Sequence, residues 1–248
     1  MIEYIWNGEI DCICKDLAKL LITMSKKFTD RMFETTKFSI NDESKKLLTK
    51  KCMKRFQDIT CVLADIIENG EYYVFDEKLE EETNAKKLNG WILLGSLTET
   101  TLQMFLAFYL DDYKNSKWKQ WQNFEIEKVK TPIIEYINSL VCDKLLTNDQ
   151  AKSIKKSITK KIEEHTTEHH VENIMFDELI QLYIHLKLLD DDEICYLRII
   201  QSNRNGIHSF QDRDIGNWVD LQNCSRFFCY LMEWVIFHLP DIPDEYYL

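Results

Sequence analysis

Glycine and proline are scarce in this sequence of 248 residues, which contains six glycines and three prolines. Turn-rich β architectures need more of both, because glycine supplies positive φ angles and proline fixes turns. The prolines are Pro132, Pro240 and Pro243, so nearly all of the chain is free to be helical. The scarcity therefore predicts an all-α protein, built as a helical bundle.

The eight cysteines include no CxxC pair, and no histidine follows Cys12 and Cys14 at the spacing of a zinc site. The other six are scattered, mostly through apolar segments of helical periodicity. No signal peptide precedes them, so we expect buried, reduced thiols in a cytoplasmic protein.

Positive charge is in the minority, with 31 lysines and arginines against 42 acidic residues and a net charge of −11. This balance argues against a general nucleic-acid coat protein but permits a local basic site. The most basic segment is a predicted helix over 147–161, where Lys152, Lys155, Lys156 and Lys160 are candidate RNA contacts. The same segment also fits an arm that docks an acidic protein partner.

An uninterrupted apolar segment long enough to cross a membrane is also missing. Residues 90–110 would span about 30 Å as a helix. However, Thr98, Glu99 and Gln103 interrupt the apolar run. We therefore expect a core helix and no membrane partner.

Apolar residues recur at spacings of three and four through much of the chain, which indicates amphipathic helices. The pattern predicts helices over about 10–24, 41–69, 90–112, 126–146, 147–161, 176–189, 195–204 and 220–239. The first 87 residues read as an N-terminal helical extension, and residues 88–248 as one helical domain.

Histidine forms one cluster, at His165, His169 and His170. The three side chains do not fall at one repeated helical spacing, as the ligands of a metal site on a helix would. We expect no metal and no other cofactor.

An arginine and a histidine lie close together where the helix over 195–204 ends, in the segment LRIIQSNRNGIH. The Asn205–Gly206 pair is a turn signal, because both residues tolerate positive φ. Arg204 is therefore expected in the last helical turn and His208 just past the break. A permanent cation beside an imidazole that titrates near neutrality suits phosphodiester chemistry. The alternative is that Arg204 only caps the helix and His208 makes one structural hydrogen bond.

Glu99 lies in the middle of the most apolar predicted helix. A buried carboxylate without a partner is costly, so we expect it to face a cation or a helix N-terminus. Arg204 is the candidate partner, and the alternative places Glu99 on a narrow exposed strip.

The order of these segments resembles the HEPN superfamily over roughly residues 88–240. The resemblance is carried by GSLTETTLQMFLAFYL, FDELIQLYIHLKLL, an acidic turn, LRIIQSNRNGIHSF and a last amphipathic helix. It implies an all-helical domain and a metal-independent endoribonuclease of antiviral, toxin or RNA-processing systems, with Arg204, Asn205 and His208 as catalytic residues and Glu99 in support. The family usually places more residues between its arginine and histidine than the three found here. Some members are catalytically silent, so a non-catalytic interaction or nucleotide-binding module is the alternative.

Metal-free RNA cleavage needs a base for the 2′-OH, an acid for the leaving 5′-oxygen and a cation for the phosphorane. One copy of the chain supplies one imidazole at this site, so a two-fold dimer would complete it. We therefore expect RNA as substrate, a homodimer that involves the final helices, and a neutralising or regulatory protein partner.

Overall fold

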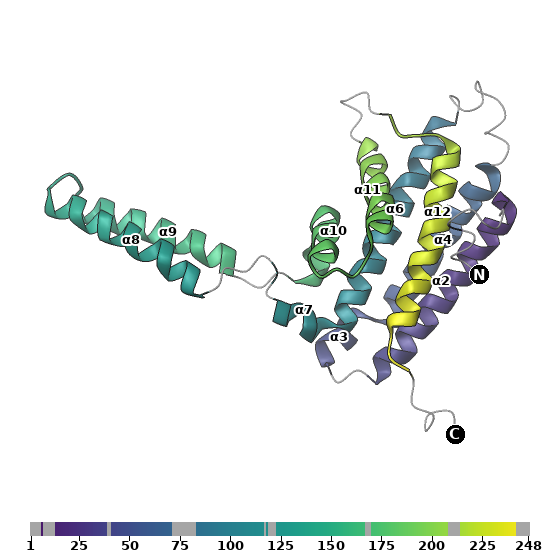
Figure 1. The fold of residues 1–248 in the computed structure, drawn as a ribbon, viewed down its shortest axis with the longest axis horizontal. Coiled ribbons are helices and arrows are strands. Elements are labelled where there is room, and N and C mark those ends of the chain that lie inside the picture. The colour runs from purple at the N-terminus through teal and green to yellow at the C-terminus, as the bar shows by residue number, and fades with distance from the viewer. Residues whose placement is uncertain are drawn as a thin grey trace. The chain divides into compact units, whose positions relative to one another are not determined.

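The computed structural model describes residues 6, 13–38, 41–70, 83–116, 118, 123–166, 170–207 and 214–241. Within these ranges the chain forms ten α-helices and two short 3₁₀ helices, and no strand (Figure 1). The prediction of an all-α helical bundle is confirmed.

The helices are numbered in chain order. Their bounds are α2 Cys14–Lys37, α3 Asp42–Leu47, α4 Lys50–Gly70, α6 Asn84–Phe108, α7 Leu110–Ser116, α8 Asn123–Cys142, α9 Asn148–Thr166, η2 Val171–Asn173, α10 Phe176–His185, α11 Asp191–Arg204, η3 Asn205–Ile207 and α12 Trp218–His238.

The chain divides into two compact units. Unit 1 comprises residues 1–110 and 171–248, and unit 2 comprises residues 111–170. In unit 1, α2 and α4 pack together with α6 and α12. The division into an N-terminal extension and a later domain stays a prediction.

In unit 1, α6 is the central helix. It contacts α4, α10, α11 and α12, which come from distant parts of the sequence (Figure 1). Trp91, Leu94 and Leu102 on α6 have no exposed surface. The helix is long and apolar enough to cross a membrane by length and composition, yet 61% of its most apolar 18-residue window is buried inside the protein. It is a core helix, as the sequence predicted.

The N-terminal helices bury one stripe each against this core. On α2 the fully buried side chains include Leu17, Leu21 and Phe28, at spacings that put them on one face. This face lies against α4 and α12. Each fully buried residue of this size contributes about 1.5–3 kcal/mol of burial free energy, so unit 1 has an extensive core of its own.

The helix predicted over 41–69 is broken into α3 and α4. Asn41 caps α3 as expected, because its side-chain oxygen accepts hydrogen bonds from Glu43 N and Ser44 N at 2.9 and 3.3 Å. The break has a local cause: the hydroxyl of Thr49 accepts from Cys52 N at 3.2 Å and starts a second helix.

Unit 2 contains the helical hairpin of α8 and α9. Its turn uses Lys144 at φ 59° and returns the amide of Leu145 to Leu140 O at 2.9 Å. Thr147 then begins α9, because its hydroxyl accepts from Gln150 N at 3.3 Å. The predicted start of this helix at Thr147–Asn148 is confirmed.

Candidate functional site

The helix that carries Arg204 is fixed at its beginning by a capping box. The carboxylate of Asp190 accepts from Glu193 N at 2.9 Å, and Glu193 Oε2 accepts from Asp190 N at 2.6 Å. The buried Glu193 also accepts from the hydroxyl of Tyr230 on α12 at 2.6 Å. The beginning of α11 is therefore held both by its own cap and by α12. These contacts fix the orientation of the helix, and with it the position of Arg204 at its other end.

Arg204 is the last residue of α11, as the sequence predicted, but the chain does not turn at positive φ after it. Asn205 has φ −71° and ψ −9°, and a 3₁₀ turn continues to Ile207. Gly206 is not among the residues with positive φ. The predicted end of the helix is confirmed, but the turn does not use the positive φ that both residues tolerate, and the glycine is needed for its small size instead. A Cβ at Gly206 would lie 2.5 Å from Ile215 Cγ2, so close packing requires its small size.

Glu99 and Arg204 form an ion pair between α6 and α11. The distance from Arg204 Nη1 to Glu99 Oε2 is 2.5 Å. The side chain of Glu99 is 17% exposed and that of Arg204 is 31% exposed. The expected pairing is confirmed, and the alternative of an exposed strip is wrong. In this semi-buried setting the two charges neutralise each other, so removing either one leaves the other uncompensated.

Gly95 and Phe176 shape the space around the same arginine, and sequence reasoning missed both. A Cβ on Gly95 would lie 2.5 Å from Arg204 Cδ and 3.0 Å from its Cβ, so the arginine stem lies directly on the glycine. The ring of Phe176, at the start of α10, has its centroid 5.9 Å from Arg204 Cζ. The signal for Gly95 was its position four residues before Glu99, which puts both on one face of α6.

The arrangement holds the guanidinium while leaving part of it accessible. An arginine side chain has five N–H donors. Among the described residues Arg204 makes one side-chain hydrogen bond, to Glu99, and its side chain is partly exposed. A group with its stem packed and one edge anchored can present its other donors to an anion without a large loss of conformational freedom.

A second polar cluster lies further back on α11, and it too was missed. Arg198 Nη1 donates to Asp177 Oδ1 at 2.5 Å, and Gln201 Nε2 donates to the same oxygen at 3.3 Å. Gln181 donates to the other oxygen of Asp177 at 2.5 Å. Because Asp177 follows Phe176, the first turn of α10 touches both arginines of α11.

Of the two remaining proposed catalytic residues, the structure describes Asn205 but not His208. Asn205 is exposed beside Arg204. His208 lies outside the described residues, so its proposed role stays a prediction. Glu99, Arg204 and Asn205 are thus brought together at one end of α11, where α6 and α10 also contact this helix.

The candidate RNA-contacting lysines lie on α9 in unit 2. Lys152, Lys156 and Lys160 are exposed, and Lys155 Nζ donates to Asn138 Oδ1 at 2.6 Å across the hairpin. Their contribution to an RNA site stays a prediction. Of the histidine cluster, His169 and the side chain of His165 lie outside the described part of the structure, so the expectation of no metal stays a prediction as well.

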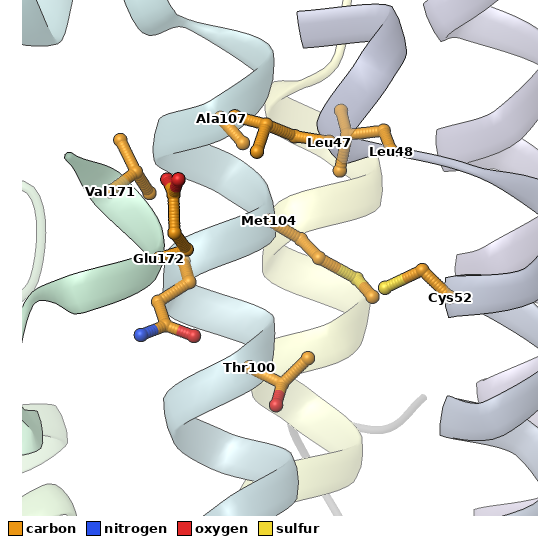
Figure 2. Close-up of a pocket in the computed structure, with 9 residues that line it drawn as sticks. Leu47, Leu48, Cys52, Thr100, Met104, Ala107, Val171 and Glu172 are labelled. Carbon is orange, nitrogen blue, oxygen red and sulfur yellow. The ribbon is translucent and has the colours of Figure 1, made fainter.

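A small apolar pocket of about 110 Å³ opens beside α6 in unit 1 (Figure 2). Its lining comes from α3, α4, α6 and η2 and consists of Leu47, Leu48, Cys52, Thr100, Gln103, Met104, Ala107, Val171 and Glu172. Burial raises the pKa of the Cys52 thiol, the opposite of the shift that activates a nucleophile. The pocket can hold a small apolar group, and its thiol is not an activated nucleophile.

Comparison with known proteins gives no further assignment: no family model, no curated protein and no solved structure matches this chain.

Proposed function

We propose that this protein is a HEPN-like, metal-independent endoribonuclease of the cytoplasm, an effector of antiviral-defence or toxin type that acts as a dimer. The observation that carries the proposal is the Arg204–Glu99 ion pair, which joins the glutamate of α6 to the arginine that opens the segment RNGIH. No disulfide joins the cysteines of the described ranges, which agrees with a reducing compartment.

Arg204 is proposed to bind the scissile phosphate and to stabilise the negative charge that grows on it. Glu99 anchors one edge of the guanidinium at 2.5 Å, and Gly95 supports its stem. This anchoring makes the cation a preorganised electrostatic group, which is more effective than a mobile lysine at the surface.

His208 is proposed to move the protons. In the cleavage step the 2′-oxygen attacks phosphorus, its proton goes to a base, and the 5′-oxygen leaves with a proton from an acid. The products are a 2′,3′-cyclic phosphate and a 5′-hydroxyl, so atoms and charge balance without water or metal. An imidazole suits either role because its ordinary pKa lies near neutral pH. Asn205 is proposed to orient the imidazole or the phosphate.

The dimer follows from the need for two proton-transfer groups in one site. The apolar residues in the middle of α12 do not support an interface there, because Phe227, Phe228 and Leu231 are fully buried within the chain and α12 packs on α2 and α6. The exposed Val219 and Phe237 lie near opposite ends of the helix. The dimeric site therefore rests on the chemistry of the second imidazole alone.

A non-catalytic interaction or nucleotide-binding module is the second candidate. The same ion pair favours it, because Glu99 already satisfies Arg204 within the chain, as a purely structural contact between α6 and α11 would. The short spacing from Arg204 to His208 points the same way, since a misplacement of about 1 Å can cost a hundredfold in rate.

Purified protein incubated with unstructured RNA separates the two candidates. If the enzyme proposal holds, His208→Ala lowers the cleavage rate about a hundred- to ten-thousandfold. Arg204→Lys lowers it as well, because an ammonium cannot present the same planar set of donors. Cleavage persists in chelator, and DNA is not cut because it lacks the 2′-hydroxyl.

A thermal melt of each variant checks that it is folded. Glu99→Gln is measured as a further variant. This variant keeps the arginine but loses the charge that anchors it. Equal cleavage by the wild type and His208→Ala assigns the activity to another site or to a contaminant. Absence of cleavage by the folded wild type over varied RNA substrates and added nucleotides rejects the enzyme and favours the module.

A further inference from the structure

The pocket on α6 is formed within unit 1 by elements that lie far apart in the sequence. Its floor is one face of α6, where Met104 and Ala107 follow each other at a spacing of three residues. Figure 2 shows Glu172 of η2 on one side of this face and Leu47 and Cys52, of α3 and α4, on the other. All of these residues belong to unit 1, so the pocket is a feature of one compact unit.

The apolar walls of the pocket are held in place by the core. Met104, Ala107 and Val171 are each no more than 4% exposed. Thr100 also lines the pocket, but its hydroxyl donates to Ser96 O at 2.8 Å and is thereby satisfied within α6. The pocket is therefore a largely preformed apolar space, as small-molecule sites usually are.

The polar groups that the lining offers to a ligand are hydrogen-bond acceptors. Gln103 Nε2 donates to Ile174 O at 3.1 Å, which leaves the amide oxygen of Gln103 as an acceptor. Glu172 is exposed, and its carboxylate makes no hydrogen bond or ion pair with the described residues. Among the described residues that line the pocket, none is a lysine or an arginine.

The Cys52 thiol does not change this balance of charge. Burial raises the pKa of the thiol, and the nearby charge of Arg55 lowers it by less, so the thiol is neutral at pH 7. Arg55 itself is exposed and does not line the pocket. The charge that the described lining presents is therefore the negative charge of Glu172.

The volume of the pocket limits the apolar part of a ligand. The pocket encloses about 110 Å³, and a closed apolar cavity of about 150 Å³ holds a benzene molecule. Because this pocket opens to solvent, only the apolar part of a ligand needs to fit inside it. One ring or one short branched alkyl group meets this limit, whereas a long acyl chain exceeds it.

We propose that this pocket binds a small organic amine, whose apolar group enters the pocket and whose ammonium group meets the carboxylate of Glu172 at the mouth. Opposite charges attract there, whereas a short carboxylic acid would place a second carboxylate beside Glu172. A neutral molecule of the same shape gains the burial but not the ionic contact. The inference requires no ribonuclease activity and involves neither Arg204 nor His208, so it stands or falls independently of the proposed function.

Benzylamine, benzyl alcohol and benzoate share one shape and test the charge preference, each titrated into the full-length chain with carbon-13-labelled methionine methyl groups. The Met104 methyl signal, assigned with Met104→Leu, is expected to shift with benzylamine at a dissociation constant of about one millimolar, the order that suits a ligand of this size. Benzyl alcohol is expected to bind about threefold to fivefold more weakly, and benzoate about tenfold or more. Met175 is 69% exposed, and its signal is the control that should not shift. Absence of a saturable Met104 shift overturns the proposal, as does benzoate that binds as tightly as benzylamine.

Glu172→Gln removes the charge without disturbing the core, because the side chain is exposed. It should weaken benzylamine about threefold to fivefold and leave benzyl alcohol within about twofold. Glu135→Gln makes the same change at an exposed position in unit 2 and should leave both constants unchanged. An amine affinity that Glu172→Gln does not lower overturns the ionic contact.

Ala107→Leu tests the position of the apolar group, because the larger side chain fills the pocket. It should weaken benzylamine and benzyl alcohol alike, by about tenfold or more. A thermal melt checks that the variant is folded. Unchanged binding of both ligands to folded Ala107→Leu would place them elsewhere and overturn the proposal.

Discussion

In unit 1, α6 packs against α3, α4, α10, α11 and α12, and its central apolar side chains are fully buried. In unit 2, α8 packs against α9, and within the described residues its side chains Val129, Ile133 and Tyr136 are exposed. Both helices have apolar residues on more than one face, so hydrophobic pattern alone does not distinguish them. The difference is the number of faces that each helix buries within its own unit.

This difference determines where precise chemistry can be placed. The Glu99–Arg204 pair lies on helices that the core of unit 1 already fixes, so the position of the guanidinium is set by packing. A polar group needs that kind of support to act as a preorganised site. Val129, Ile133 and Tyr136 on α8 are exposed instead, so packing within unit 2 does not fix their side chains in the same way.

Truncating a core side chain in unit 1 should have the largest effect on stability. Phe28 on α2 is fully buried, and its ring centroid is 5.2 Å from that of Phe56. Phe28→Ala is expected to lower the free energy of unfolding by about 3–5 kcal/mol, because it removes burial and leaves a cavity. Ile133 lies exposed on α8, so Ile133→Ala should lower the free energy of unfolding by less than about 1 kcal/mol. Urea unfolding followed by circular dichroism measures both, and equal losses would contradict the comparison between the units.

Sequence reasoning succeeded where one strong physical requirement acted alone. A single carboxylate in an apolar helix needs a cation, and this requirement was enough to pair Glu99 with Arg204. The caps at Asn41 and Thr147 were also predictable, because a cap depends on residues within one turn. The all-α class followed from composition and periodicity together.

It failed where packing between distant segments decided the outcome. At Gly206 the local turn signal marked the end of α11 correctly, but it could not predict the contact with Ile215 that excludes a side chain there. The contacts of Gly95 and Phe176 with Arg204 depend on how three helices meet, and the only local signal was the spacing of four residues between Gly95 and Glu99. The exposure of Val129, Ile133 and Tyr136 on α8 was not predictable either, because periodicity identifies an apolar face but not the element that covers it.

Gly95→Ala tests whether the packing of unit 1 tolerates one added methyl group beside the Glu99–Arg204 ion pair. The new Cβ would lie 2.5 Å from Arg204 Cδ, so the arginine stem must move. We expect a loss of about 1–3 kcal/mol in unfolding free energy, despite the better helix propensity of alanine. Ser96→Ala is the neighbouring control, with an expected change within about 0.5 kcal/mol. A neutral or stabilising Gly95→Ala would show that the arginine is not held as described.

A double-mutant cycle on Glu99 and Arg204 measures the pair itself. Glu99→Gln, Arg204→Gln and the double variant should give a coupling energy of about 1 kcal/mol, smaller than for a fully buried pair because Arg204 is partly exposed. High salt should reduce the coupling only in part, since the pair is semi-buried. A coupling near zero would mean that α6 and α11 are held by apolar packing alone.

Removing the hydroxyl of Tyr183 should have the smallest effect on the free energy of unfolding at neutral pH. At alkaline pH it should have a distinct effect. Its fully buried hydroxyl donates to Leu102 O at 2.9 Å, from α10 to α6. Tyr183→Phe should cost about 0.5–1.5 kcal/mol at pH 7, the typical net value of one hydrogen bond. Tyr136→Phe in unit 2 is the control, because that side chain is exposed and its loss should change little.

Burial raises the pKa of Tyr183 well above its ordinary value of 10, because the phenolate would lose its hydration. Below pH 10 the phenol is neutral in the folded and unfolded chains, so it adds no pH dependence. Above pH 10 the unfolded chain releases this proton while the folded chain keeps it, and stability falls as pH rises toward the folded pKa, by up to about 1.4 kcal/mol per pH unit. Tyr183→Phe should remove that part of the alkaline decline, whereas Tyr136→Phe should keep it. Unfolding free energies at pH 7, 9, 10 and 11 measure the difference, and parallel curves for wild type and Tyr183→Phe would mean that the phenol is hydrated in the folded protein.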